Sequence, residues 1–490
     1  MFFVPLYLII RYLDMNKDKK IERLERQLAR LREENQQLKS DVRSAKKEVA
    51  KANKKKRHQD NNTERRTRTV VVSPVRGHKF SELAIKLATV IYSNVGCGLR
   101  SVVKLLEIID ETFDGVFQGE LPSHTEISNW AKKNGLATYA DSGKRLSDMK
   151  YCEIIDECIT VGNQKVLLTL AAPSAPQGHP LRHEDVEALG IAVAPSWDGD
   201  SVKNEIGHCS RKVGHDPKYI VSDNGVNLSK GIRETGITHH RDISHSIGLI
   251  LEDTYKGQSD FEAFTSNLSN VRLKYHLTDT AFLLPPKQRA IARFMNLFEW
   301  VRWAGDILKA YPDLNDKQQQ AFAFVMESRS LIEELTSVME CVRDIERRCK
   351  NEGISKETAK LCAWMASRLI TSGTANKRTI AVGSKIGTYL LGEAEKIGDK
   401  DKAHIISSDI IESIFGWYKT RKPSNKLCGV TASVLNIATI GKLSTKEGRT
   451  KFDFKGNMEA VRLADIKEWK ELNLLDNWAV NRKKTLKKVG

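Results

Sequence analysis

Hydrophobic positions recur at coiled-coil spacing near the start of the chain, beginning at Ile21. Aliphatic residues alternate between the a and d positions of a heptad for about four repeats. Asn35 occupies one a position, where a buried amide pairs with its twin in a parallel two-stranded coil. The pattern predicts a coiled coil over residues 15–52 that makes the protein a homodimer, although a single amphipathic helix packed on its own chain is the alternative. The predicted dimer contacts are Leu24, Leu28, Leu31, Asn35 and Leu38.

A short apolar run precedes the heptad, at residues 2–13. It is shorter than the roughly 20 residues of a membrane-spanning helix, and it contains Pro5 and Arg11. A signal peptide also fits poorly, because no basic residue precedes the run and no small-residue cleavage site follows it. We interpret residues 1–14 as the result of a misassigned start, with translation beginning at Met15, and we expect no association with a membrane.

Helical spacing returns after a basic linker at residues 53–75 and predicts a small helical domain over residues 76–145. Its last helix begins with Ser123 and Glu126 at the spacing of a capping box. Lys132 and Lys133 would then lie near the end of that helix, as in a helix-turn-helix that binds DNA. A three-helix unit that does not bind DNA is the alternative. The residues expected to pack inward are Ile127, Trp130 and Ala131.

From residue 150 the period changes from that of a helix to that of strands. Two alternating runs flank the turn pair Gly162-Asn163 and predict a β-hairpin, which a third strand, a helix and a fourth strand follow. Asp156 would lie on the first strand and Asp223 at the exit of the fourth. The order predicts an α/β core, a mixed sheet flanked by helices, whose first part spans residues 150–255.

The remaining chain is mostly helical in its periodicity. Residues 256–400 predict an all-α insertion, residues 401–445 return to the core, and residues 446–490 read as a basic C-terminal tail. Within 401–445, Glu412 lies on a helix whose apolar residues would pack on the sheet and turn this carboxylate toward the strand ends.

The order Asp156, Asp223, Glu412 resembles the acidic triad of DDE transposases, which have an RNase H-like catalytic core. The stretch from Asp242 to His245 resembles a short D-x-x-H signature of several transposase groups, and the helical insertion resembles that of hAT-type enzymes. The resemblance implies a transposase of a mobile element that cleaves DNA and transfers its strands. It covers about residues 79–440 and assigns no named insertion-sequence family.

Three carboxylates suit this chemistry, because phosphodiester transfer uses two hard divalent cations that bind oxygen ligands. The resemblance implies two Mg²⁺ or Mn²⁺ ions, with Asp156 bridging them and Asp223 and Glu412 each completing one site. Asp242 and His245 would orient a ligand or contact the phosphate, or else simply cap a surface helix. Glu157 is a rival for Asp156, but strand alternation would turn it to the opposite face.

Charge supports a nucleic-acid partner, since 79 Lys and Arg against 62 Asp and Glu give a net charge of +17. The eight cysteines form no CxxC pair, which favours the cytoplasm, at the nucleoid when the protein is bound to DNA. The expected partners are the element ends and the target DNA. The predicted DNA contacts are Lys54, Lys55, Lys56, Arg57, Arg65, Arg66, Lys132, Lys133, Lys419, Arg421 and Lys422.

Three other readings compete with an active transposase. A domesticated, catalytically inactive transposase would keep the architecture and act as a DNA-binding regulator. A nuclease of the same fold would cleave DNA without joining it, and only a strand-transfer assay separates the two. A purely structural coiled-coil protein would leave everything beyond residue 70 unexplained.

Overall fold

The computed structural model describes most of the chain from Val75 to Lys487. The described residues do not include the predicted coiled coil with its dimer contacts, or the basic residues of the linker. Lys422 also lies outside them. Among the described residues, no helix is both long and apolar enough to cross a membrane. The gaps are 114, 118–119, 288–293, 295–296, 372–374, 400, 422–424 and 426–428.

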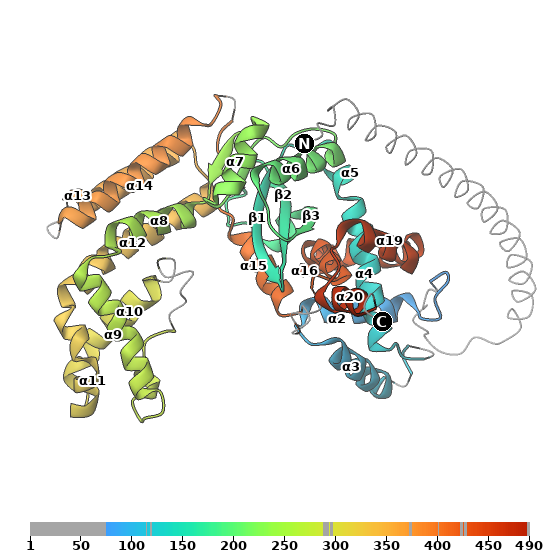
Figure 1. Cartoon of the computed structure of the whole chain (residues 1–490), viewed down its shortest axis with the longest axis horizontal. Coiled ribbons are helices and arrows are strands. Elements are labelled where there is room, and N and C mark those ends of the chain that lie inside the picture. Colours follow the sequence, from blue (N-terminus) through green and yellow to red (C-terminus); the bar gives the residue numbers. More distant parts are fainter. Residues whose placement is uncertain are drawn as a thin grey trace, which may run out of the picture. The chain divides into compact units, whose positions relative to one another are not determined.

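A mixed five-stranded sheet forms the centre of the α/β part (Figure 1). Its strand order is β3-β2-β1-β4-β5, in which β1, β2 and β3 are antiparallel neighbours and β4 and β5 run parallel to β1. The predicted hairpin is confirmed, and Gly162 takes the left-handed φ of 66° that its turn requires. The strands are β1 (Tyr151–Val161), β2 (Gln164–Pro173), β3 (Glu187–Ala194), β4 (Ile220–Ser222) and β5 (His239–Arg241).

Helices cover both faces of the sheet. On one face α6 (Gly199–Val213) and α7 (Val226–Thr235) pack on side chains such as Ile155. On the other face α15 (Asp409–Lys419) packs on side chains such as Ile154, because its apolar residues fall on one side of the helix. The alternation of β1 thus sends consecutive residues to opposite cores. Short 3-10 turns accompany this layer at η1 (His183–Asp185) and η6 (Ala432–Thr439).

Three main helices precede the sheet, as predicted: α2 (Glu82–Asn94), α3 (Leu99–Thr112) and α4 (His124–Ala140), with a short α5 (Ser142–Leu146) after them. The capping box is confirmed, since the Glu126 backbone N–H donates to Ser123 Oγ and the Ser123 N–H donates to Glu126. Ile127, Trp130 and Ala131 are buried, as expected.

The prediction that Lys132 and Lys133 lie near the end of their helix is wrong, because α4 continues to Ala140. Lys133 is only 8% exposed, and its Nζ donates to the carbonyl of Met458 at 3.3 Å. The sequence could not show this, because the segment that covers Lys133 comes more than 300 residues later in the chain.

The C-terminal residues fold instead of forming an extended tail. They make α16 (Ile440–Ser444), α17 (Lys446–Lys451), α18 (Phe454–Ala460), α19 (Leu463–Asn473) and α20 (Trp478–Leu486). Both α18 and α19 pack on α4, as η6 does. The helical domain predicted near residues 76–145 is therefore covered by the end of the chain.

The described residues of the predicted insertion form helices joined by turns and loops, and they have a core of their own, which includes Phe261, Trp300 and Leu335. This core begins earlier than predicted, at Ile243, so that α8 joins the sheet to the helices (Figure 1). The elements are α8 (Ile243–Tyr255), α9 (Ser259–Tyr275), η2 (Ala281–Leu283), α10 (Leu297–Ala310), η4 (Tyr311–Asp313), α11 (Asp316–Glu327), α12 (Arg329–Glu352), α13 (Lys356–Thr371) and α14 (Lys377–Glu395).

Candidate active site

Acidic residues follow the parallel part of the sheet where its pairing ends. Ile155 pairs with Ser222 on β4, and Ser222 pairs with Arg241 on β5. The next residue along each strand direction is Asp156, Asp223 and Asp242 respectively. The strand register therefore brings three carboxylates to one border of the sheet. We call Asp156, Asp223, Asp242 and Glu412 the acidic edge.

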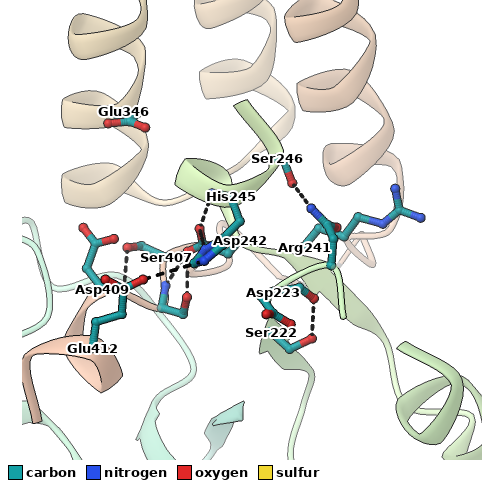
Figure 2. Close-up of polar contacts among 12 residues, drawn as sticks. Ser222, Asp223, Arg241, Asp242, His245, Ser246, Glu346, Ser407, Asp409 and Glu412 are labelled. Atoms are coloured by element: carbon teal, nitrogen blue, oxygen red, sulfur yellow. Dashed lines mark hydrogen bonds and ion pairs between the residues drawn. The ribbon is translucent and has the colours of Figure 1, made fainter. Parts of the chain in front are cut away.

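Glu412 reaches this edge from the first turn of α15. The neighbouring Ile411, Ile414 and Phe415 are buried against the sheet, as predicted, and fix the helix in place. The Glu412 side chain stays 46% exposed, and its Oε1 lies 3.7 Å from Nε2 of His245. Figure 2 shows Glu412, Asp409, Asp242 and His245 close together.

Asp242 is a fully buried residue that ties two helices to the edge. Its Oδ1 accepts from the His245 backbone N–H at 2.7 Å, which caps α8, and lies 2.9 Å from His245 Nδ1. Its Oδ2 accepts from the backbone N–H and the Oγ of Ser408, at 2.7 and 2.9 Å, where α15 begins. Because both oxygens are used within the protein, Asp242 positions His245 and α15 and is not a free ligand.

The acidic edge has more carboxylate groups than cationic groups. Burial, followed by the charge of Asp223, raises the pKa of Asp156 to about 7, against the lowering effects of a backbone hydrogen bond and of His245. Burial also raises the pKa of Glu412. The hydrogen bond to Asp242 raises the pKa of His245 to about 9, so this imidazole is protonated at neutral pH. One imidazolium therefore faces several carboxylates.

The edge fits a hard divalent cation by the type of its donors, since carboxylate oxygens are the ligands that Mg²⁺ and Mn²⁺ prefer. A bound cation would also favour the ionised form of Asp156, whose pKa is raised by burial and then by the charge of Asp223. Across the described part of the chain, however, no three His, Cys, Asp or Glu side chains are gathered closely enough to hold a metal ion. The donors are thus of the right kind, but they are not assembled around one point.

Three other carboxylates that could be considered as metal ligands have cationic partners. Asp409 lies 2.7 Å from Lys350, and Glu157 lies 3.1 Å from Lys165. Glu393 is buried, and its carboxylate is paired with a histidine and a lysine. A register shift after Asp156 interrupts the alternation that was expected to turn Glu157 away.

Two groups near the edge were missed by sequence reasoning. Lys350 on α12 lies between Asp409 and Glu346, at 2.7 and 3.6 Å. Ser408 binds Asp242. Nothing in the local sequence pointed to a role for Lys350, because it is one of many charged residues on a long amphipathic helix. Ser408 directly precedes the helix that carries Glu412, and such a serine is a common helix cap.

Among the predicted DNA contacts near the end of α15, Arg421 is engaged within the protein. Arg421 donates to the backbone carbonyl of Ser93 at 3.3 Å, and its guanidinium lies 4.2 Å from the ring centre of Trp417. It thereby joins α15 to α2, so that its charge is used within the protein. Lys419 is the last residue of α15.

Comparison with known proteins adds no identity to this geometry. No model of a known protein family matches the sequence, and no curated protein matches it.

Proposed function

We propose that the protein is a DDE-type DNA transposase that cleaves DNA strands and joins them to a target. The observation that carries the proposal is the convergence of Asp156, Asp223 and Glu412, from three distant segments, on one border of a sheet. The strand order, with an antiparallel β1-β2-β3 meander and parallel β4 and β5, is the order of an RNase H-like core and supports that assignment. A separate helical body inserted before Glu412 supports it further.

In this proposal Asp156, Asp223 and Glu412 hold two Mg²⁺ or Mn²⁺ ions. When bound, these ions activate the attacking oxygen and stabilise the leaving oxygen of the phosphodiester. Asp242 fixes the orientation of His245 through Nδ1, and Nε2 then faces Glu412 at 3.7 Å. As an imidazolium, His245 restrains Glu412 and can donate from Nε2 to a phosphate oxygen.

The DNA partner, both element ends and target, is proposed from the +17 charge of the chain. The homodimer rests on the heptad, and the location at the nucleoid follows from the DNA partner. Of the predicted DNA contacts, Lys133 and Arg421 are engaged within the protein, and the others remain part of the proposal.

A divalent-metal assay on the flanking DNA of the protein's own element tests the proposal. With Mg²⁺, the full chain should nick that DNA and join the freed end to a second duplex, and EDTA should stop both steps. Cleavage without joining would instead identify a nuclease of the same fold.

The second candidate is an inactive relative of such enzymes that regulates by binding DNA. The observation that favours it is that the described residues hold no assembled group of three metal-binding side chains. Specific DNA binding, with neither cleavage nor joining in Mg²⁺ or Mn²⁺, would decide for this alternative.

A further inference from the structure

A cleft of about 750 Å³ lies beside the acidic edge, between α8 and α14. Two of its lining residues, Asn224 and Arg241, are the immediate chain neighbours of Asp223 and Asp242. Figure 2 shows Arg241 and Ser246 on one side of the cluster, with Asp409 and Glu412 on the other. We call this space the α8–α14 cleft. The hydroxyl groups on its wall belong to Ser229, Ser246, Ser384, Thr388 and Tyr389.

The cleft is built by specific contacts between α14 and the sheet. The Tyr389 hydroxyl donates to the backbone carbonyl of Arg241 at 2.7 Å, and Lys396 Nζ donates to the carbonyl of His239 at 2.8 Å. The Nδ2 of Asn224 donates to Ser246 Oγ at 3.3 Å. The Oδ1 of Asn224 is buried without a hydrogen-bond partner among the described residues. One wall thus carries a polar atom that the protein does not satisfy.

The charges of the lining leave one unmatched cation. Asp253 pairs with Lys385, and Glu393 pairs with Lys396 at 2.8 Å. The Arg241 side chain makes no hydrogen bond or ion pair with any residue that the structure describes. Its guanidinium therefore gives the cleft a positive centre, surrounded by hydroxyl and amide groups. Such a combination is typical of contacts to phosphate oxygens.

We propose that the α8–α14 cleft binds the sugar-phosphate backbone of the DNA strand whose phosphate enters the acidic edge, with Arg241 contacting a phosphate next to the scissile one. This inference rests on the proposed function for the nature of the strand. Arg241 and Asp242 are consecutive, so one strand can reach both the cleft and the edge. Leu249, which is 50% exposed on α8, offers an apolar surface to a sugar or base.

The size of the cleft favours a single strand. Its volume falls within the roughly 300–1,000 Å³ of small-ligand sites, which suits one or two nucleotides and is too small for a duplex. The strand would therefore separate from its complement at this point.

Hydrogen exchange measured on the full chain in EDTA, with and without oligothymidine of about ten nucleotides, tests the cleft apart from catalysis. Amides of residues 246–253 and 384–396 should become protected. Arg241→Gln should remove this protection and weaken binding about tenfold, as the loss of one charge-assisted hydrogen bond does. Ser384→Glu should weaken binding by repulsion, whereas Ser384→Gln, similar in size but neutral, should not.

Arg211→Gln is the matched control, since Arg211 is an exposed arginine on α6 and no residue of α6 lines the cleft. Equal losses in Arg211→Gln and Arg241→Gln, or no protection of α8 and α14, would overturn the inference. If the wild-type chain cleaves DNA and Arg241→Gln has the same kcat/KM, the cleft assignment fails while the proposed function stands. Protection of the cleft without any cleavage in Mg²⁺ or Mn²⁺ supports the cleft and contradicts the transposase.

Discussion

Two clusters of histidine and carboxylate side chains lie at β5, and they differ in how their charges are matched. One is the acidic edge, which begins at Asp242. The other, which we call the buried joint, consists of His240, Glu393, Lys396 and His404. In the joint, His240 Nδ1 lies 2.8 Å from Glu393 Oε2, and His240 Nε2 lies 2.8 Å from His404 Nδ1. Lys396 completes the set with Glu393 at 2.8 Å.

The pKa values of buried carboxylates are shifted in opposite directions in the two clusters. Burial raises the pKa of Glu393, but hydrogen bonds from His240 and Lys396 outweigh it and hold that pKa below its usual value. At the edge, burial and Asp223 together raise the pKa of Asp156 to about 7. Glu393, whose charge is paired, links α14 to the sheet. A group of carboxylates with too few cationic partners would instead favour the binding of a cation. Partners, and not residue types, therefore separate a structural cluster from a candidate active site.

The largest expected effect is on catalysis. Asp156→Asn, Asp223→Asn and Glu412→Gln should each reduce Mg²⁺-dependent cleavage by at least about 10³-fold while DNA binding stays nearly unchanged, because each removes a negative charge without changing the side chain's size. A double variant should be scarcely worse than a single one, since the residues act as one site. Single-turnover cleavage and anisotropy binding measure the two properties.

Glu157→Gln is the internal control for this series. Its carboxylate is paired with Lys165, so activity should persist. Wild-type turnover in Glu412→Gln would remove Glu412 from the site, and Glu393, Glu395 and Asp409 would then be tested.

The second-largest effect is on stability, and here the buried joint should be more sensitive to substitution than the acidic edge. Glu393→Gln should lower the free energy of unfolding by about 3 kcal/mol, because it removes a buried negative charge and leaves His240 and Lys396 without their carboxylate partner. Glu412→Gln should be neutral or stabilising, because it removes a carboxylate from a repulsive group. Urea unfolding of both variants measures this, and a larger loss in Glu412→Gln would refute the distinction.

Local patterns were sufficient to predict much of the fold and the positions of the three acidic residues along it. The hairpin around Gly162, the position of Asp156 on β1, and the apolar face of α15 that turns Glu412 to the edge all follow from periodicity and turn chemistry. The D-x-x-H stretch opens a helix directly after β5, with Asp242 as its cap. These features depend on residues close together in the sequence.

Long-range packing could not be predicted in the same way. Lys133 is covered by Met458, and Arg421 is bound by Ser93, so two expected DNA contacts are internal. The partnership of His240 with Glu393 spans 153 residues and left no periodic signal. Partners of this kind are set by the tertiary fold, and a single sequence does not record them.

The third effect is the response to metal. Mg²⁺ should raise the melting temperature of the wild-type chain, because a ligand that binds only the folded state stabilises it by about 2.7 kcal/mol at a concentration of 100 Kd. Asp156→Asn should abolish most of this shift. Glu393→Gln, in the buried joint, should keep it even though its starting temperature is lower. A shift equal in all three proteins would mean that the cation binds elsewhere.

The smallest effect concerns pH and belongs to the buried joint. Burial, and then the neighbouring His240, lower the pKa of His404 to about 4, against about 6.5 in an unfolded chain. The unfolded state therefore binds the proton more tightly, so the stability contributed by this neutral histidine is complete above pH 6.5 and is lost as the pH falls toward 4. At pH 5 the loss is about 2 kcal/mol. His239, whose pKa burial also lowers to about 4, adds to the same trend.

The free energy of unfolding, measured between pH 7 and 4.5, should depend less steeply on pH in His404→Asn than in the wild type. His276→Asn, at an exposed histidine, should follow the wild-type curve. If the His404→Asn curve keeps the wild-type slope, the joint does not titrate as its geometry requires.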